Sequence, residues 1–252
     1  MLNGYAQIGH GPHKVIVMAG WFGVADDWRT TLEALDGEAF TFVLFDYRGY
    51  GLSKHIEGQY TFEEVAGDVL RLADHLDWER FSLIGHSMGG AAIQRAMLAA
   101  PQRIDRMVAV TAVPACSSRM DAARLSLFES SVGERAKRQF IINFSTGSRL
   151  PAAWTARMAG RSMDTSTSAA FAGYLNEWAT VDFSPQVQGN ATRLKVIVGE
   201  FDPTLTADVM LATWMAWYPN AQLETIANSG HYPMHETPLA LAAAIQDFLQ
   251  QP

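Results

Sequence analysis

A serine between two glycines is the first feature of this sequence that could do chemistry. Gly85-His86-Ser87-Met88-Gly89 follows the short apolar run 81–84 and precedes a stretch rich in small residues. A G-x-S-x-G pattern between a strand and a helix places the serine in a sharp, strained turn that exposes its hydroxyl. The N–H groups at the start of the following helix favour a developing negative charge. Ser87 is therefore the candidate nucleophile.

The base that would activate Ser87 is expected elsewhere in the chain. His86 is adjacent, but neighbouring side chains diverge in so tight a turn, and a base must approach the hydroxyl to about 2.6–3.2 Å. His86 is therefore interpreted as a packing residue beside the site. His231 lies in a loop between the expected strand 221–226 and the last helix. This location places His231 at the same end of the sheet as Ser87, and it is the candidate base.

A carboxylate is needed to hold the imidazole in the correct tautomer. Asp202 follows the apolar run 195–198, again where a strand should end, and is the candidate. Glu200 and Asp208 are the alternatives, because Glu200 is nearer the strand and Asp208 is expected in the following helix. The segment after the run 107–110 contains no acid at the equivalent place, which favours Asp202.

The elements that must position these residues alternate between apolar runs and helical patterns. The runs lack polar alternation and are rich in β-branched residues, as strands covered on both faces are; they are 14–18, 41–45, 81–84, 107–110 and 195–198. Strands that alternate with helices predict right-handed crossovers and fold class α/β, with an open, doubly wound, mostly parallel sheet.

This alternation stops between residues 114 and 189. Large apolar residues occur there in helical stretches with no strand between them, among them Phe128, Phe140, Ile141, Phe144, Trp154, Met158 and Trp178. We expect a helical cap of residues 114–189 inserted into a core formed by residues 1–113 and 190–252.

Charge and composition limit the class of function. The chain has 252 residues and a net charge of −7, which argues against nucleic acid or an anionic membrane as partner, because both require a basic face. Cys116 is the single cysteine, so an intramolecular disulfide is impossible. The sequence shows no signal-peptide pattern and no membrane-spanning run, and a cytoplasmic location is expected. No spacing typical of a metal site or a phosphate-binding loop is present, so neither metal nor cofactor is expected.

The chain resembles the α/β-hydrolase superfamily, in the branch of small cofactor-free esterases, enol-lactone hydrolases and haloperoxidase-like perhydrolases. Besides the serine motif, residues 46–53 read Asp-Tyr-Arg-Gly-Tyr-Gly-Leu-Ser and match the turn D-x-R-G-x-G-x-S. Residues 20–23, Gly-Trp-Phe-Gly, resemble the oxyanion loop of that family. Asp202 and His231 fall on its acid and base positions, in the expected order Ser, Asp, His. The resemblance also implies a cap inserted after the sixth strand.

Two departures from the family pattern stand out. The family usually has His-Gly where this chain has Ala19-Gly20. This chain therefore lacks the imidazole that the family has beside its oxyanion loop. In addition, few residues precede the run 14–18, and the first edge hairpin of the family is expected to be shortened.

The resemblance implies a serine hydrolase that cleaves a small or medium carboxylic ester, lactone or thioester through an acyl-enzyme. The backbone N–H groups of Trp21 and Met88 would hold the oxyanion. The expected partner is a small-molecule acyl substrate, and the residues expected to line its pocket are Phe22, Trp154, Met158 and Trp178. Two alternatives stay open: a perhydrolase or carbon–carbon bond hydrolase with the same three residues, and a non-catalytic hydrolase-like binding protein.

Overall fold

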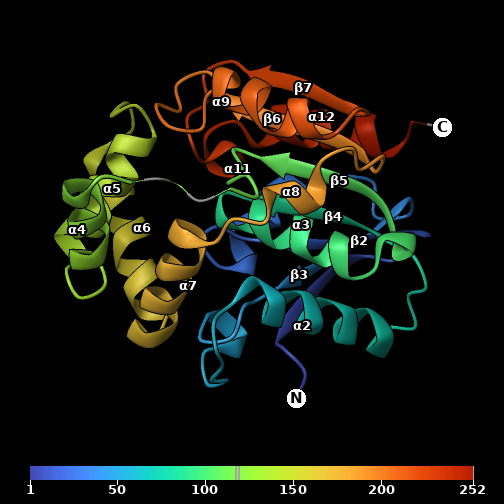
Figure 1. Ribbon diagram of the computed structural model, residues 1–252, viewed down its shortest axis with the longest axis horizontal. Coiled ribbons are helices and arrows are strands. Elements are labelled where there is room, and N and C mark those ends of the chain that lie inside the picture. The colour runs from blue at the N-terminus through green and yellow to red at the C-terminus, as the bar shows by residue number, and fades with distance from the viewer. Residues whose placement is uncertain (117, 119, 252) are drawn as a thin grey trace.

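A mostly parallel sheet forms the centre of the computed structural model, which describes residues 1–116, 118 and 120–251 (Figure 1). The described residues form seven strands in the order β1-β3-β2-β4-β5-β6-β7. Strand β1 pairs antiparallel with β3, and every other pair is parallel. The strands are β1 (Tyr5–Gly9), β2 (His13–Met18), β3 (Phe40–Phe45), β4 (Phe81–His86), β5 (Ile104–Val110), β6 (Arg193–Gly199) and β7 (Ala221–Ile226). The α/β fold class expected from the sequence is confirmed.

Helices cover this sheet because its central strands are apolar on both faces. Every residue of β3 and β4 is buried. Helices α2 and α3 pack together, as do α1 and α12. The helices outside the insertion are α1 (Arg29–Leu32), α2 (Phe62–His75), α3 (Met88–Ala99), α9 (Ala207–Ala212), α10 (Trp214–Trp217), α11 (Pro233–Glu236) and α12 (Pro238–Leu249), with 3-10 turns η1 (Ala25–Trp28), η2 (Gly51–Ser53) and η3 (Pro101–Arg103).

Among the described residues, five helices lie between β5 and β6. They are α4 (Ala122–Ser130), α5 (Arg135–Ser145), α6 (Ala152–Thr165), α7 (Ser168–Thr180) and α8 (Ser184–Val187). In Figure 1, α4 to α7 stand together beside one end of the sheet. The insertion follows β5, the fifth strand of the chain, so the expectation that it follows the sixth strand was wrong. The strand count is lower because a single strand, β1, precedes β2. The division of the chain into a cap of residues 114–189 and a core stays a prediction. Three residues of these two parts, Ser117, Arg119 and Pro252, lie outside the described residues.

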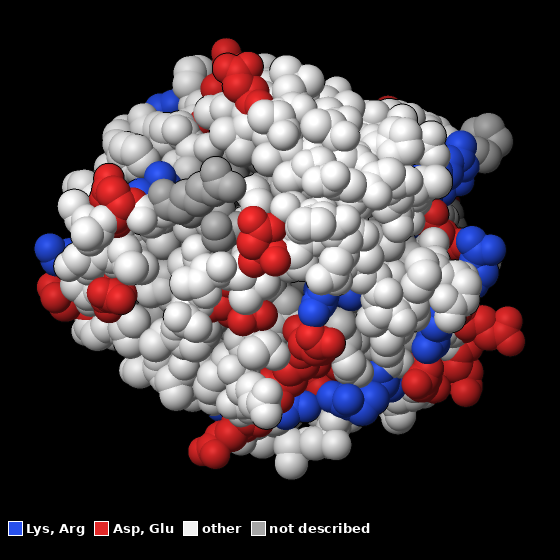
Figure 2. All heavy atoms as spheres, viewed as in Figure 1, with Lys and Arg blue, Asp and Glu red and all other residues white. Residues whose placement is uncertain are grey.

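Charged side chains of both signs share the surface seen in Figure 2. Acidic and basic groups are interspersed there with broad uncharged areas between them. This face therefore lacks the continuous basic surface that a nucleic-acid backbone requires. In the part of the chain that the structure describes, we find no helix with the length and apolar character needed to cross a bilayer.

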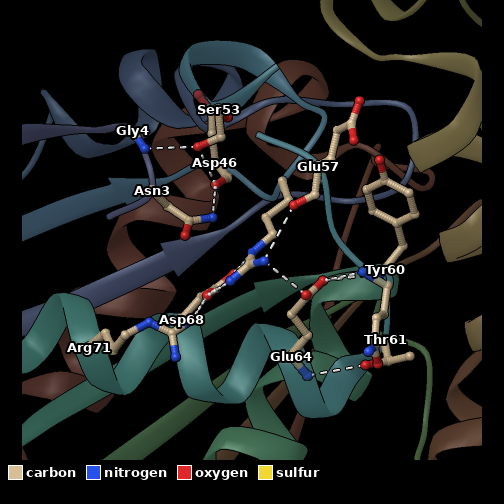
Figure 3. Close-up of polar contacts among 12 residues, drawn as sticks. Asn3, Gly4, Asp46, Ser53, Glu57, Tyr60, Thr61, Glu64, Asp68 and Arg71 are labelled. Atoms are coloured by element: carbon tan, nitrogen blue, oxygen red, sulfur yellow. Dashed lines mark hydrogen bonds and ion pairs between the residues drawn. The ribbon is translucent and has the colours of Figure 1, made fainter. Parts of the chain in front are cut away.

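A buried charge network fixes the turn after β3 (Figure 3). Arg48 Nε and Nη2 each donate to a carboxylate oxygen of Asp68 at 2.8 Å, and Nη1 lies 2.9 Å from Glu64 Oε1. The Asp68 side chain is only 1% exposed and also contacts Arg71. Because Glu64 and Asp68 belong to α2, the network attaches residues 46–53 to that helix.

Replacing Arg48 by methionine should lower the free energy of unfolding by about 3 kcal/mol, because it leaves the buried Asp68 carboxylate with one partner fewer. The matched control is Arg80→Met, which removes a pair with Asp105 whose side chains are 65% and 36% exposed. Such a surface pair contributes about 0–1 kcal/mol. Urea unfolding at neutral pH measures both losses, and equal losses would contradict the account.

Candidate active site

Ser87 occupies the turn between β4 and α3 with a backbone conformation that is rare outside glycine. Its φ is 51° and its ψ is −118°. A Cβ on Gly85 would lie 2.3 Å from the Gly89 oxygen, and a Cβ on Gly20 would lie 2.9 Å from that of Ser87. The Ser87 N–H donates to the Val110 oxygen at 3.1 Å, which holds the turn. Glycines at these positions therefore allow three segments to meet around a strained serine.

His231 joins Ser87 to Asp202. Its Nε2 lies 3.0 Å from Ser87 Oγ, and its Nδ1 lies 2.6 Å from Asp202 Oδ2. A proton on Nδ1 donates to the carboxylate and leaves Nε2 free to accept the serine proton. The structure thus brings together the three residues that the sequence analysis selected, from the ends of β4, β6 and β7.

The Asp202 carboxylate is buried and bonded on both oxygens. Oδ1 accepts hydrogen bonds from the N–H groups of Thr204 at 2.9 Å and Leu205 at 3.0 Å. Burial alone would raise the pKa of Asp202, but the charge and hydrogen bond of His231, together with the two backbone donors, lower that pKa below its ordinary value. Asp202 is therefore ionised at neutral pH and orients His231.

Neither alternative acid contacts His231. Glu200 Oε2 instead accepts a hydrogen bond from the Asn228 N–H at 2.9 Å. Asp208 lies in the first turn of α9 and is exposed. Among the three acids near this strand end, Asp202 alone has the geometry of an orienting carboxylate.

His86 supports the backbone of His231 and does not bond Ser87. Its Nε2 donates to the His231 carbonyl oxygen at 2.7 Å, and Thr111 Oγ1 donates to the same oxygen at 2.9 Å. Burial, followed by the nearby His231, lowers the pKa of His86 well below its usual value. The neutral ring therefore carries its proton on Nε2. This agrees with the interpretation of His86 as a residue beside the site and adds a hydrogen bond that the sequence did not indicate.

Trp21 and Met88 are the two residues whose backbone N–H groups the sequence analysis expects to hold an oxyanion. Both residues line the same cavity as Ser87 and His231. Met88 is the first residue of α3, so its N–H has no acceptor within the helix. Within the described residues, neither amide donates to a protein oxygen. Two such amides beside a nucleophile can bind a developing negative charge.

A cavity of about 760 Å³ extends from Ser87 and His231 toward the inserted helices. Most of its lining is apolar and includes Leu127, Phe128, Ile141, Trp178, Leu205 and Val209. Phe140 and Phe144 of α5 also line it, although 57% and 50% of their surfaces are exposed. Large exposed aromatic residues on one helix mark the approach to an apolar cavity.

The expected pocket residues divide into two pairs. Phe22 and Trp178 line the cavity, whereas Trp154 and Met158 of α6 do not. The Trp154 ring packs edge-on against Tyr232, with ring centroids 5.8 Å apart, and Met158 is buried in the core. The apolar spacing of α6 indicated that these side chains face inward, but it did not indicate what they pack against, and Trp154 is only partly buried. Phe140, Ile141 and Phe144 line the cavity instead, and the run of large apolar residues in α5 was the signal that could have indicated them.

Replacing Asp202 by asparagine should reduce stability most near neutral pH. A carboxyl whose pKa is lowered by folding contributes stability above its unfolded pKa of about 3.9, and this contribution disappears as the pH falls through the folded pKa. The stability advantage of the unaltered protein should therefore be full at about pH 6 and shrink below about pH 5. Urea unfolding across this range measures it, and a difference independent of pH would contradict the lowered pKa.

Known proteins resemble part or all of this chain. The dihydrolipoyllysine-residue acetyltransferase component of an acetoin cleaving system from Cupriavidus necator is 34% identical over 109 residues, which are 43% of this chain and 29% of that protein. The serine hydrolase BPHL of Mus musculus is 32% identical over 108 residues, which are 41% of this chain and 37% of that protein. The matched segments thus span well under half of these relatives.

Solved structures share the fold over nearly the whole chain. A hydrolase from Oleispira antarctica has a TM-score of 0.88 at 20% identity and covers 99% of this chain and 95% of its own. An esterase from Exiguobacterium antarcticum has a TM-score of 0.87 at 16% identity, with coverage of 98% and 95%. A bromoperoxidase from Bacillus anthracis has a TM-score of 0.84 at 19% identity, again with 98% and 95%. At these identities the likeness establishes the fold alone.

The family model described as alpha/beta hydrolase fold matches residues 14–238. This range contains the serine turn, the strand ends that carry Asp202 and His231, and the inserted helices. The chain belongs to the α/β hydrolase fold family.

Proposed function

We propose that this protein is a serine hydrolase that cleaves small or medium carboxylic esters, lactones or thioesters through an acyl-enzyme. The observation that carries the proposal is the continuous series of contacts from Ser87 through His231 to Asp202 at one end of an apolar cavity. The relatives named as a serine hydrolase and an esterase support the same reaction class.

Acylation begins when Ser87 Oγ attacks the carbonyl carbon and His231 Nε2 takes the hydroxyl proton. The carbonyl oxygen becomes an oxyanion that the N–H groups of Trp21 and Met88 stabilise. The tetrahedral intermediate then collapses, the bond to the leaving group breaks, and His231 returns the proton to the departing alcohol or thiol. Ser87 is left as an ester of the acyl group.

Deacylation repeats these steps with water as the nucleophile. His231 Nε2 takes a proton from the water as its oxygen attacks the acyl carbon. When the intermediate collapses, Ser87 Oγ recovers that proton and the carboxylic acid leaves. Asp202 stays ionised throughout and stabilises the imidazolium that forms twice in each cycle.

The apolar cavity favours an uncharged acyl group. Each methylene that leaves water for such a lining gains about 0.8 kcal/mol, whereas a buried charge without a partner loses far more. The cavity volume of about 760 Å³ has room for more than an acetyl group. We therefore expect kcat/KM to rise from acetyl to medium-chain esters.

Replacing Ser87 by alanine should abolish both labelling by a fluorophosphonate probe and release of p-nitrophenol from acyl esters. Both reactions need Oγ, and the loss of a triad member leaves only about 10³–10⁴-fold catalysis over water. Active-site titration of the unaltered protein and the variant measures this.

The other possible outcomes of this titration favour one of the alternative functions. Labelling without ester turnover would favour the perhydrolase or carbon–carbon bond hydrolase, which assays with hydrogen peroxide or a vinylogous diketone would then separate. No labelling of the folded protein would contradict an assembled triad and favour a binding protein.

Replacing Ile141 by tryptophan should shift the acyl preference toward short chains. The larger ring occupies part of the cavity, so kcat/KM should fall at least tenfold more for octanoyl than for acetyl esters, in line with about 0.8 kcal/mol for each methylene excluded. Trp154→Phe is the control, because Trp154 does not line the cavity. A similar shift in both variants would refute this assignment of the acyl site.

A further inference from the structure

Two buried tyrosines hold the oxyanion loop, where this chain lacks the usual histidine. The Tyr47 hydroxyl donates to the Ala19 oxygen at 2.8 Å, and the Tyr50 hydroxyl donates to the Trp21 oxygen at 3.0 Å. These two carbonyls flank the peptide between Gly20 and Trp21, whose N–H is the proposed oxyanion donor. We propose that Tyr47 and Tyr50 are positioning residues that fix this N–H relative to Ser87. The inference rests on the proposed function.

The loop has few other attachments. The Gly23 N–H donates to the Gly20 oxygen at 3.0 Å within the loop itself, and Trp21 Nε1 donates to the Phe171 oxygen of α7 at 2.8 Å. Among the described residues, no donor other than these phenols bonds the oxygens of Ala19 and Trp21. Loss of either hydroxyl would therefore leave a buried carbonyl unpaired and free the peptide to rotate.

Both phenols are permanent donors in rigid surroundings. Each tyrosine is 1% exposed, and burial raises the pKa of both hydroxyls far above the usual value. Their rings pack against Tyr174, with ring centroids 5.4 Å from Tyr47 and 5.8 Å from Tyr50. The hydroxyls thus keep their protons at neutral pH and can donate them to the two carbonyl oxygens.

The turn of residues 46–53, which carries both tyrosines, is itself held in place by hydrogen bonds and ion pairs. Asp46 Oδ1 accepts a hydrogen bond from the Ala25 N–H and Oδ2 accepts one from the Leu52 N–H, each at 2.9 Å. The Asp46 carbonyl oxygen also accepts hydrogen bonds from Asn3 and Ser53 (Figure 3). In addition, the ion pair of Arg48 with Asp68 attaches the turn to α2. The motif D-x-R-G-x-G-x-S therefore acts in this chain as the frame for two tyrosines at variable positions.

The test compares Tyr47→Phe and Tyr50→Phe with Tyr174→Phe as the matched control. Tyr174 is buried in the same cluster, but its hydroxyl has no hydrogen-bond partner. We expect kcat for ester hydrolysis to fall about 10- to 100-fold in each of the first two variants, somewhat less than the loss of a whole oxyanion donor, with KM within about threefold. Affinity for an aryl boronic acid, which forms a tetrahedral adduct on serine, should fall in parallel. The control should keep both values within about twofold.

Amide hydrogen exchange separates failure of this inference from failure of the proposed function. Exchange in residues 19–23 should rise about tenfold in Tyr47→Phe and Tyr50→Phe but not in Tyr174→Phe, because local opening follows the loss of local bonds. Unchanged exchange, or unchanged kcat with lower thermal stability, would overturn the positioning role. If the unaltered protein hydrolyses no ester, the proposed function fails, and the exchange result alone decides whether the tyrosines hold the loop.

Discussion

The hydrogen bonds that fix His231 are the constraint on which the rest of the site depends. Its N–H donates to the Ser145 oxygen of α5 at 3.1 Å, and its carbonyl accepts from His86 and Thr111. The buried Glu236 carboxylate binds the N–H groups on either side of His231, at 2.8 and 3.0 Å. Elements from the sheet, the insertion and the C-terminal helices therefore meet at one residue. With its backbone fixed, the ring can reach Ser87 and Asp202 at the same time.

The strained serine and the proposed oxyanion loop depend on the same close packing. Ser87 keeps a positive φ where three segments pack closely around it, and the neighbouring glycines permit that close approach. The loop that carries Trp21 is attached to the core turn through Tyr50 and to the insertion through Phe171. Trp21 and Phe171 also stack, with ring centroids 3.9 Å apart. The position of the inserted helices and the position of the proposed oxyanion donor are thus physically linked.

The sequence predicted most of the fold and that Ser87, Asp202 and His231 meet, because apolar runs and glycines mark the strand ends that carry them. Ser87, Asp202 and His231 each follow such a run. Pocket residues were harder to predict, since helical spacing indicates that Trp154 faces inward without indicating what it packs against. Contacts between distant segments, such as Tyr50 with Trp21, carry no local pattern. They emerge only when the turn and the loop are brought together in space.

The acyl-enzyme is the intermediate on which this account depends, and trapping it is the most direct test. The protein would be mixed with a medium-chain p-nitrophenyl ester, quenched in acid within milliseconds, digested and analysed by mass spectrometry. The account predicts one acyl group on the peptide that contains Ser87, formed during the first turnover and absent from Ser87→Ala. Product release without acylated Ser87, or acylation of a different side chain, would contradict it.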